Sequence, residues 1–524
     1  MQDAIAQSRR KRQKPSAKCA LNQSAMKSFA VTTLGCKVNQ YDACAVSTAL
    51  VGAQLRPARP GESPDLIVIN TCCVTAEAMR KSRQAIRRAV RKAPDAHVFI
   101  LGCYGDYDAA GIRQLLVSMD VRSDKALVAG PCDDLAKRVR ALASRLTARG
   151  PDCPAPIGQD DATAGERDEV LMSAVGRPAR VANANSYNLI KAPAEGEVKE
   201  NFIGTQGLGP IGRFGGRQRA FVKVQDGCDA MCTYCVVCHT RRRLWSRSID
   251  EVVAECRALV AAGHREIVLC GVFLGAYGRA TAVRKRWQGE ASRLPGLLRA
   301  VAGIDGLWRV RLSSLEPGDL NGDLLSACGD LPNFAPHFHL PLQSGSPRIL
   351  RSMNRQYTAA AYRRTIDRLR AALESPAVTT DILVGFPSEG DADFAATLEM
   401  ARYAGFAKIH AFPFSPIEPT AAWRRRDQAP PPNVVKARLA ELAQVERLTA
   451  RAFRRQFVGR TMEALVERPR RPKSRSRQAM TDRYITVHFD APKLVPPESL
   501  TGQIVRLQIL EITDDGATGH LVDD

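Results

Sequence analysis

The sequence predicts an α/β protein with three folded regions, and three observations carry this prediction. Residues 28–147 alternate short apolar runs with helical patterns, as in a parallel sheet covered by helices. Residues 217–452 repeat a strand–helix unit roughly six times, which predicts a parallel (β/α) barrel or partial barrel. Residues 456–524 are rich in strand patterns and poor in helical ones, so we expect a small antiparallel β-barrel of the oligonucleotide-binding type there.

Each region is assigned from its own periodicity. In the first region we expect strands at Phe29–Thr33, Leu66–Asn70 and Val98–Leu101, and helices at Ala76–Lys92 and Leu135–Thr147. In the second, the expected strands are Ala220–Val224, Glu266–Leu269, Arg309–Ser313, His337–Leu340, Thr379–Val384 and Lys408–Phe412. Helical patterns between them lie at Ile249–Ala262, Leu320–Cys328, Ala359–Ala372 and Asp391–Ala404. The third region has strand patterns at Thr461–Glu467, Tyr484–Phe489, Ile504–Ile512 and Ala517–Leu521.

Two segments are expected to lie outside these domains. Residues 148–216 are rich in Gly, Pro, Ala and charge and have little periodicity, so we interpret them as a linker or insertion. Met1–Lys27 is basic and lacks the apolar stretch of a secretory signal, which leaves either an arm or an over-extended start. No run of 18 apolar residues predicts a membrane span, so we expect a cytoplasmic protein with no membrane contact.

The chain carries a strong excess of positive charge. Its 76 Lys and Arg against 54 Asp and Glu give a formal net charge of +22. Such a field attracts polyanions, nucleic acid first and anionic membranes second, although an arginine-rich proteome would produce the same composition. In a reducing cytosol the 15 cysteines are expected to be metal ligands or spectators and not disulfides.

Three cysteines in the second region have the spacing C-x₃-C-x₂-C. Cys228, Cys232 and Cys235 follow a predicted strand, so they lie on a loop at its carboxyl end, where barrel enzymes place their chemistry. Three thiolates on so short a loop can hold three irons of a [4Fe–4S] cluster and leave the fourth iron open. A structural zinc site is the alternative, because Cys238 or His239 could supply a fourth ligand.

Three further cysteines each follow an apolar strand of the first region. Because parallel strands end at one edge of a sheet, the thiols of Cys36, Cys72 and Cys103 can converge into a second three-cysteine site. The alternative is a set of small buried core residues, the commonest fate of free cysteine. We interpret the following cysteines as spectators: Cys19, Cys44, Cys73, Cys132, Cys153, Cys256 and Cys328.

The segment from Arg219 to Cys235, Arg-Ala-Phe-Val-Lys-Val-Gln-Asp-Gly-Cys-Asp-Ala-Met-Cys-Thr-Tyr-Cys, resembles the radical S-adenosylmethionine (SAM) loop of the methylthiotransferase family. The segments around the first-region cysteines resemble that family's N-terminal domain, and residues from about Gly459 resemble its RNA-binding TRAM domain. The resemblance implies an N-terminal α/β methylthiotransferase domain (28–147), a radical SAM core with a partial TIM-type (β/α) barrel (217–452) and an OB-like TRAM β-barrel (456–524).

The resemblance also implies cofactors and their ligands. In the family, SAM binds the open iron of one [4Fe–4S] cluster and is cleaved to a 5′-deoxyadenosyl radical, while a second [4Fe–4S] cluster carries or donates sulfur. By resemblance the metal ligands are Cys36, Cys72, Cys103, Cys228, Cys232 and Cys235. Strand-end motifs in matching order give the SAM-binding residues Tyr234, Gly271, Gly275, Ser313, Glu316, Gln343, Gly385 and Pro387. No catalytic residue is assigned beyond the cluster ligands.

The family modifies either adenosines beside the tRNA anticodon or an Asp of a ribosomal protein. The net charge and the TRAM-like region favour the tRNA anticodon loop as the substrate. Lys37, Val38 and Gln40, with the Arg80–Gln84 run, resemble the branch acting on N6-threonylcarbamoyladenosine-37. The isopentenyladenosine-37 branch, the ribosomal-protein branch and a non-catalytic zinc RNA-binding protein are the alternatives. An electron donor such as flavodoxin or ferredoxin is implied as a partner.

The sequence departs from the family in two places. The segment 148–216 is longer than the usual link between the domains. After the third loop cysteine the family usually has Ile-Ile-Pro, an aromatic residue and then Arg-Gly, whereas this chain reads Val236-Val-Cys-His-Thr-Arg-Arg242. The loss of Pro and Gly predicts a different backbone beside the cluster, although the three ligands remain.

Overall fold

The computed structural model describes residues 26–147, 205–215, 218–287, 289–468, 476–491 and 496–522. The basic N-terminal arm up to residue 25 and most of the expected insertion, residues 148–204, lie outside the described residues. None of the helices in the described ranges is both long and apolar enough to cross a membrane.

The N-terminal domain is a parallel five-stranded sheet in the order β2-β1-β3-β4-β5. The strands are β1 Ser28–Thr33, β2 Arg56–Pro57, β3 Leu66–Thr71, β4 His97–Gly102 and β5 Ala126–Val128. The helices are α2 Lys37–Gly52, α3 Ala76–Lys92, α4 Cys103–Tyr107, α5 Ala109–Val117 and α6 Leu135–Thr147. The three expected strands and two expected helices are confirmed, and the carboxyl ends of β1, β3 and β4 meet at one edge.

Helix α2 was not predicted, and its burial explains why. It is covered on more than one side, by β1, β3 and α6 of its own domain and by β6 of the barrel. Apolar and polar positions are therefore both buried along it, among them Val46, Asn39 and Asp42. A helix buried on several faces lacks the single apolar stripe from which amphipathic helices are recognised.

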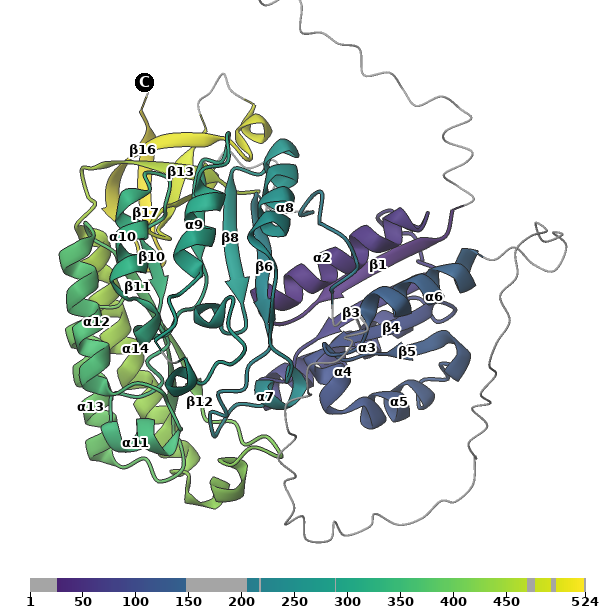
Figure 1. Ribbon diagram of the computed structural model, residues 1–524, viewed down its shortest axis with the longest axis horizontal. Helices are drawn as coiled ribbons and strands as arrows, with labels where there is room; N and C mark the ends of the chain where they lie inside the picture. Colours follow the sequence, from purple (N-terminus) through teal and green to yellow (C-terminus); the bar gives the residue numbers. More distant parts are fainter. Residues whose placement is uncertain are drawn as a thin grey trace, which may run out of the picture.

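The central domain is an open barrel of six parallel strands, as predicted (Figure 1). Its strands form the ladders β6-β8-β9 and β10-β11-β12, and isolated parallel bridges from Val310 to Phe334 and from Ser314 to His339 join the two. The strands are β6 Arg219–Asp226, β8 Glu266–Gly271, β9 Arg309–Leu312, β10 His337–His339, β11 Ala377–Val384 and β12 Lys408–Pro413, with the short antiparallel β7 Trp245–Ser246 beside β6. The β6 and β12 edges are not paired with each other, so the barrel is open on one side.

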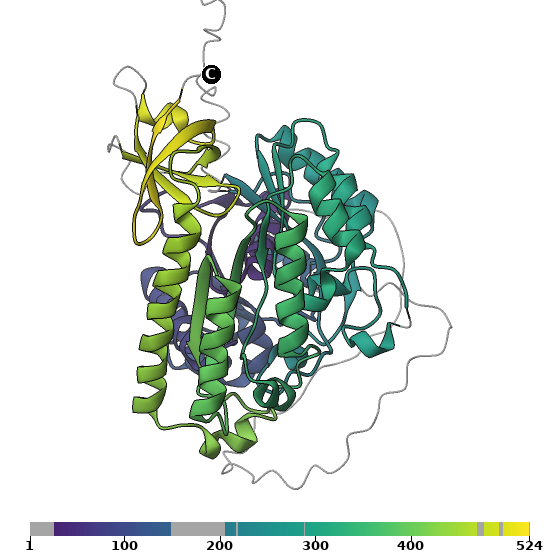
Figure 2. The ribbon, with the colours of Figure 1, turned by 90° about the vertical axis from the view of Figure 1, so that its left-hand side faces the viewer.

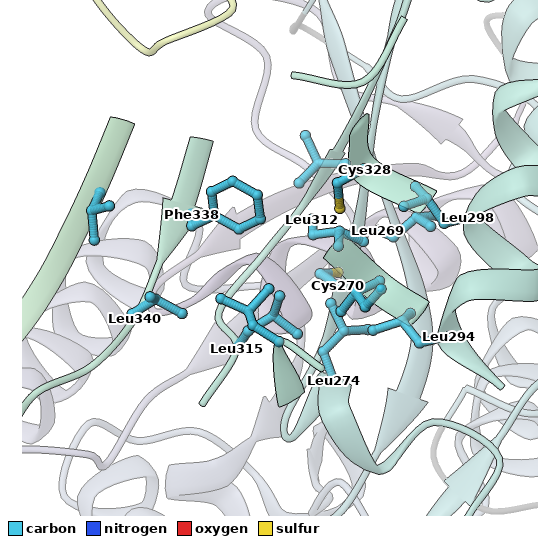
Figure 3. Packing of buried hydrophobic residues seen from close by; sticks show 14 of the residues in the cluster. Leu269, Cys270, Leu274, Leu294, Leu298, Leu312, Leu315, Cys328, Phe338 and Leu340 are labelled. Atoms are coloured by element: carbon cyan, nitrogen blue, oxygen red, sulfur yellow. The ribbon is translucent and has the colours of Figure 1, made fainter. Parts of the chain in front are cut away.

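Helices cover the outside of this barrel. They are α7 Val237–Thr240, α8 Ile249–Ala261, α9 Leu294–Ala302, α10 Gly322–Asp330, α11 Pro347–Ser352, α12 Ala359–Ala372, α13 Asp391–Ala404 and α14 Pro432–Arg455. Figure 3 shows the leucine-rich core between strands and helices, with Cys270 and Cys328 inside it. Both thiols are nearly inaccessible, and burial raises the pKa of Cys328 to about 12. Cys328 is therefore placed as a core residue.

The C-terminal domain is a closed barrel in the order β13-β14-β15-β17-β16 (Figure 2). Its strands are β13 Thr461–Val466, β14 Ser476–Thr481, β15 Thr486–Asp490, β16 Ile504–Ile512 and β17 Ala517–Leu521. The predicted small β-barrel is confirmed, and its strands pair antiparallel except for β15 and β17, which pair in parallel and close it. Strand β14 was missed because it lies next to the basic, proline-containing run of residues 468–475, which masks its pattern.

The N-terminal domain lies across the open side of the central barrel. Tyr41 of α2 donates to Glu255 of α8 at 3.1 Å, and α2 packs on β6. At the other side of the opening, Ala76 N–H donates to Ser415 Oγ just beyond β12 at 2.9 Å. The two domains also share a core, since Val38 and Tyr41 belong to the barrel's hydrophobic cluster. The carboxyl edge of the first sheet thereby faces the barrel.

A buried ion pair joins the C-terminal barrel to the amino ends of the central strands. Glu266, fully buried at the start of β8, accepts from Arg311 at 3.0 Å and from Arg309 at 3.4 Å. The two arginines in turn donate to the backbone carbonyls of Asp482 at 2.6 Å and Met480 at 3.3 Å. Glu266 therefore orients the groups that hold the C-terminal domain.

We expect Glu266→Gln to destabilise the protein by about 3–5 kcal/mol, because it leaves two buried guanidinium groups without their carboxylate. Urea-induced unfolding followed by circular dichroism measures this loss. Glu399→Gln is the matched control: Glu399 is 74% exposed, pairs with Arg363 at 3.0 Å and should change stability by less than about 1 kcal/mol. Equal effects of the two substitutions would contradict the assignment.

Candidate active site

The loop that carries Cys228, Cys232 and Cys235 leaves β6 through a turn that only glycine accommodates. Gly227 has φ +81°, and a Cβ atom there would lie 1.9 Å from the carbonyl oxygen of Arg243. The backbone N–H of Cys228 donates to the carbonyl of Arg241 at 3.0 Å. The first loop cysteine is thus fixed directly at the carboxyl end of the strand.

The rest of the loop is clamped to the segment that follows α11. Thr233 N–H donates to the Met353 carbonyl at 3.0 Å, and its hydroxyl donates to the Ser352 carbonyl at 2.9 Å. The Asn354 side chain donates to the Met231 carbonyl at 3.0 Å. These hydrogen bonds fix the position of the loop backbone between its first and last cysteines.

A cavity of about 160 Å³ lies beside the three loop thiols. It is lined by the three cysteines together with Ala230, Tyr234, Val237, Val272, Phe273, Leu274, Ser314, Leu315, Glu316, Asp319, Pro341, Gln343 and Arg355. Arg355 donates to Cys232 Sγ at 3.1 Å, to Tyr234 Oη at 3.2 Å and to Glu316 at 2.6 Å. The lining therefore combines a fixed guanidinium–carboxylate pair with apolar side chains such as Phe273 and Leu274.

Three of the residues expected to bind SAM line this cavity: Tyr234, Glu316 and Gln343. Five others do not line it: Gly271, Gly275, Ser313, Gly385 and Pro387. Gly275 packs against the lining residue Asp319, where a Cβ would lie 1.8 Å from the carboxylate. Gly385 packs against Val435 of α14, where a Cβ would lie 2.6 Å from that side chain. Ser313 is buried, and its neighbour Ser314 faces the cavity.

The second set of cysteines lies at the carboxyl edge of the first sheet. Cys72 directly follows β3 and Cys103 directly follows β4, while Cys36 ends the turn after β1. A Cβ on Gly35 would lie 3.2 Å from Cys72 Sγ, so the Cys36 turn packs directly against the second thiol. Burial, together with the neighbouring Cys103 and Cys36 thiols, raises the pKa of Cys72 to about 12. The predicted convergence of the three strand ends is thus present.

A buried charge cluster lies between the two cysteine sets. Arg241 donates to both carboxylate oxygens of Asp226 at 2.8 and 2.7 Å and to Asp42 at 2.7 Å. Lys223 donates to the same two carboxylates, at 2.5 Å to Asp42 and 2.8 Å to Asp226. Arg241 also donates from Nε to Cys103 Sγ at 3.3 Å. We refer to Lys223, Arg241, Asp42 and Asp226 as the interdomain charge cluster.

The sequence did not single out Arg241 or Arg355 as functional. Arg355 lies outside the motifs from which the SAM contacts were predicted. Its place in the site is recognised only in the structure, where it contacts both Cys232 and Glu316. Arg241 lies where the family usually has Arg-Gly, and this match was the only feature of the sequence that pointed to a role for it. The departure before it is accommodated by the short helix α7, in which the Cys238 thiol donates to the Cys235 carbonyl at 3.3 Å.

The donor sets fit iron–sulfur clusters. Each set offers three thiols and an adjacent guanidinium that donates to one sulfur. Cys is the usual ligand of such clusters, and three thiolates leave the fourth iron of a [4Fe–4S] cluster open. Burial raises the pKa of Cys228 and Cys235, so metal binding there displaces protons.

Helix α3 carries an exposed basic face beside the N-terminal cysteines. Arg80, Lys81, Arg87, Arg88, Arg91 and Lys92 are exposed, and Ile86 and Val90 are buried on the opposite face. Arg80 and Lys81 form salt bridges with Glu77, with N···O distances of 2.6 and 3.5 Å. The remaining cations provide a surface suited to phosphate contacts.

Comparison with known proteins agrees with this architecture. Residues 28–122 match the protein family UPF0004, described as uncharacterized, and residues 222–401 match the radical SAM superfamily. The chain is 33% identical over 501 residues to tRNA-2-methylthio-N(6)-dimethylallyladenosine synthase of Maricaulis maris, covering 94% of this chain and 96% of that protein. It is 32% identical over 441 residues to threonylcarbamoyladenosine tRNA methylthiotransferase MtaB of Chlamydia pneumoniae, covering 84% and 87%.

Among solved structures, the radical SAM methyltransferase TsrM of Kitasatospora setae aligns with a TM-score of 0.45 at 14% identity, covering 74% of this chain and 75% of that one. The sequence relatives have higher identity, and the one from Maricaulis maris aligns with 94% of this chain. With two cysteine sets at strand ends, a cavity beside one of them and relatives of this identity and coverage, the chain belongs to the radical SAM tRNA methylthiotransferase family.

Proposed function

We propose that this enzyme inserts a methylthio group at C2 of N6-threonylcarbamoyladenosine at position 37 of tRNA. The observation that carries the proposal is the meeting of two three-cysteine sets from different domains on one buried arginine. Enzymes of this family use SAM and two [4Fe–4S] clusters. Removal of an unactivated aromatic hydrogen needs a radical, and a sulfur source must lie close to it, so two neighbouring sites suit this chemistry.

The proposed ligands of the radical cluster are Cys228, Cys232 and Cys235, and those of the second cluster are Cys36, Cys72 and Cys103. When bound, the first cluster and SAM supply hydrogen abstraction. The protein contributes the cavity that shields the reacting groups from water: its apolar side chains exclude solvent, and Arg355 with Glu316 presents fixed polar groups to a ligand. Tyr234 and Gln343 line the same cavity and are the other proposed SAM contacts.

Two observations support the threonylcarbamoyl substrate: the residues of the first cysteine motif and the position of Lys37 within it. Lys37 is half-buried and begins α2, the helix that packs on β6 of the barrel. Burial lowers the pKa of His337 inside the barrel, and neighbouring cations, Lys37 among them, lower it further. An ammonium group beside the barrel opening suits the carboxylate of the threonylcarbamoyl group, whereas an isopentenyl group would favour an apolar residue there.

A second candidate is methylthiolation of dimethylallyladenosine in tRNA. It is favoured by the names of relatives at the same identity, including those of Maricaulis maris and Jannaschia, each at 33%. Both candidates share the clusters and the position on RNA, and they differ in the group on N6. The first motif, Gly35-Cys-Lys-Val-Asn, favours the threonylcarbamoyl substrate.

The proposed partners follow from this chemistry. The anticodon loop of tRNA is the proposed substrate region, because a loop base is already unstacked and accessible. The exposed cations of α3 and the C-terminal barrel are the proposed RNA contacts. Reductive cleavage of SAM requires a low-potential electron donor such as flavodoxin or ferredoxin. An enzyme acting on tRNA works where tRNA is found, so a cytoplasmic location is part of the proposal.

Alanine substitutions in the two cysteine sets are expected to have different effects on SAM cleavage and on product formation. Cys228→Ala, Cys232→Ala and Cys235→Ala together should remove about half the iron and abolish cleavage of SAM to 5′-deoxyadenosine. Cys36→Ala, Cys72→Ala and Cys103→Ala together should also remove about half the iron but leave SAM cleavage while abolishing methylthio product. Iron analysis and product chromatography of anaerobically reconstituted protein measure both. Full iron retention in the first variant, or normal product in the second, would contradict the ligand sets.

Cys238 is expected to bind no cluster, because its thiol donates to the Cys235 carbonyl and the fourth iron must stay open for SAM. Cys238→Ala should therefore keep its iron and its rate of SAM cleavage within about twofold, a free-energy change below about 0.5 kcal/mol. Cys235→Ala, three residues earlier, is the matched variant that should lose both. Loss of a whole cluster in Cys238→Ala would make Cys238 a ligand.

The substrate is tested by mass spectrometry of tRNA nucleosides from a strain lacking the gene. The threonylcarbamoyl nucleoside should accumulate with complete loss of its methylthio form, and the isopentenyl nucleosides should not change. A gene copy with Cys228→Ala should fail to restore the product, which ties the defect to the radical site. Loss of the methylthio form of isopentenyladenosine instead would select the second candidate.

A further inference from the structure

One buried residue, Arg241, contacts both cysteine sets, one through its side chain and the other through its backbone carbonyl. Arg241 donates from Nε to Sγ of Cys103, at 3.3 Å, and its carbonyl accepts from the N–H of Cys228, at 3.0 Å. Cys103 follows β4 of the N-terminal domain, whereas Cys228 follows β6 of the central barrel. A single residue therefore links the thiol of one proposed cluster to the loop backbone of the other.

The orientation of this guanidinium is fixed by its other nitrogens. Nη1 donates to both oxygens of Asp226, and Nη2 donates to Asp42 at 2.7 Å and to the Asn39 side chain at 3.0 Å. The Arg241 side chain is only 3% exposed. A planar guanidinium with both ends bound cannot turn, so its Nε–H is directed at the sulfur of Cys103.

The interdomain charge cluster is electrically balanced, since it holds two cations and two carboxylates. A guanidinium stays protonated in proteins, and here two buried carboxylates pair with it. The group beside Cys103 is therefore charged. Its donor to sulfur is charge-assisted, the stronger class of hydrogen bond.

We propose that Arg241 is a positioning residue that raises the reduction potential of the N-terminal cluster through its hydrogen bond to Cys103. The proposal rests on the ligand set Cys36, Cys72 and Cys103 given above. One-electron reduction by an external low-potential donor adds one negative charge to the cluster. A hydrogen bond and a positive charge at a ligand sulfur stabilise this reduced state, and such bonds are among the determinants of cluster potentials.

The contacts of Arg241 also hold the Cys228–Cys235 loop in a fixed position relative to the carboxyl edge of the N-terminal sheet. Displacement of the loop at Cys228 would pull the Arg241 backbone and break the bonds to Asp42, Asn39 and Cys103 together. At the other site Arg355 donates to Cys232, but it also lines the cavity, so its removal would disturb the SAM pocket. Arg241 is not among the residues that line that cavity, which allows its effect on one cluster to be measured alone.

The test uses the full-length chain with Cys228→Ala, Cys232→Ala and Cys235→Ala, so that the N-terminal cluster is the one that remains. In this parent, Arg241→Met is combined with Asp226→Asn. The pair removes one positive and one negative charge, so Lys223 and Asp42 still balance each other. Iron content is measured first, and the midpoint potential is then obtained by dithionite titration followed by electron paramagnetic resonance.

The double variant should keep about four irons and show a more negative midpoint than the parent. Arg241→Lys alone should also shift the midpoint negatively, because one ammonium cannot serve Asp226, Asp42 and Cys103 at once. Arg242→Met is the matched control: Arg242 is exposed, pairs with Asp106 at 3.3 Å, and its removal should leave the midpoint unchanged.

An unchanged or more positive midpoint in the iron-bound double variant would overturn the inference. If the double variant loses its iron while Arg241→Lys keeps both iron and the parent's midpoint, Arg241 serves folding alone and the inference is again overturned. Absence of iron from the parent itself would overturn the ligand assignment of the proposed function, and the inference with it.

Discussion

The interdomain charge cluster is the constraint on which the rest of the site depends. Lys223 and Arg241 from the barrel domain meet Asp42 from the N-terminal domain and Asp226 from β6, all at 5% side-chain exposure or less. Burial of four charges costs desolvation free energy, so the cluster is not expected to add much to the net stability of the fold. Removing one of them leaves a buried unpaired charge, however, so the domains are restricted to the one arrangement that pairs all four. That arrangement brings the two sets of thiols together.

Around this cluster, glycines that allow close packing and hydrogen bonds to the backbone shape the rest of the site. Gly227 allows the radical loop to turn beneath Arg243, and Gly275 allows Asp319 to approach the cavity wall. Asp319 in turn accepts from Arg284 at 2.6 Å and from the Glu316 N–H at 2.7 Å. The polar wall of the cavity is therefore built in advance of any ligand, so that little reorganisation is needed when one binds.

Much of this architecture could be predicted from sequence, because buried strands and amphipathic helices have local patterns. Helices α3 and α6 and all six parallel strands of the barrel lie where the periodicity placed them, within a residue or two for most strands. Helix α2 has no such pattern, since it is buried on several sides. The glycines expected to contact SAM were chosen from motif position and do not line the cavity, whereas three of the eight expected residues do. Arg241 and Asp42 are 199 residues apart, and no local pattern reports a pairing over that distance.

The C-terminal barrel is held at the amino ends of β8 and β9, whereas the loop thiols follow the carboxyl end of β6. Strand β6 has eight residues, so at about 3.3 Å per residue its two ends are separated by roughly 26 Å. A tRNA that made the proposed contacts with both the C-terminal barrel and the loop thiols would have to span at least that length. A free nucleoside is too small to do so, whereas a base-paired stem that ends in a loop is long enough. With these proposed contacts, the overall shape of the tRNA would count in selection together with its reacting base.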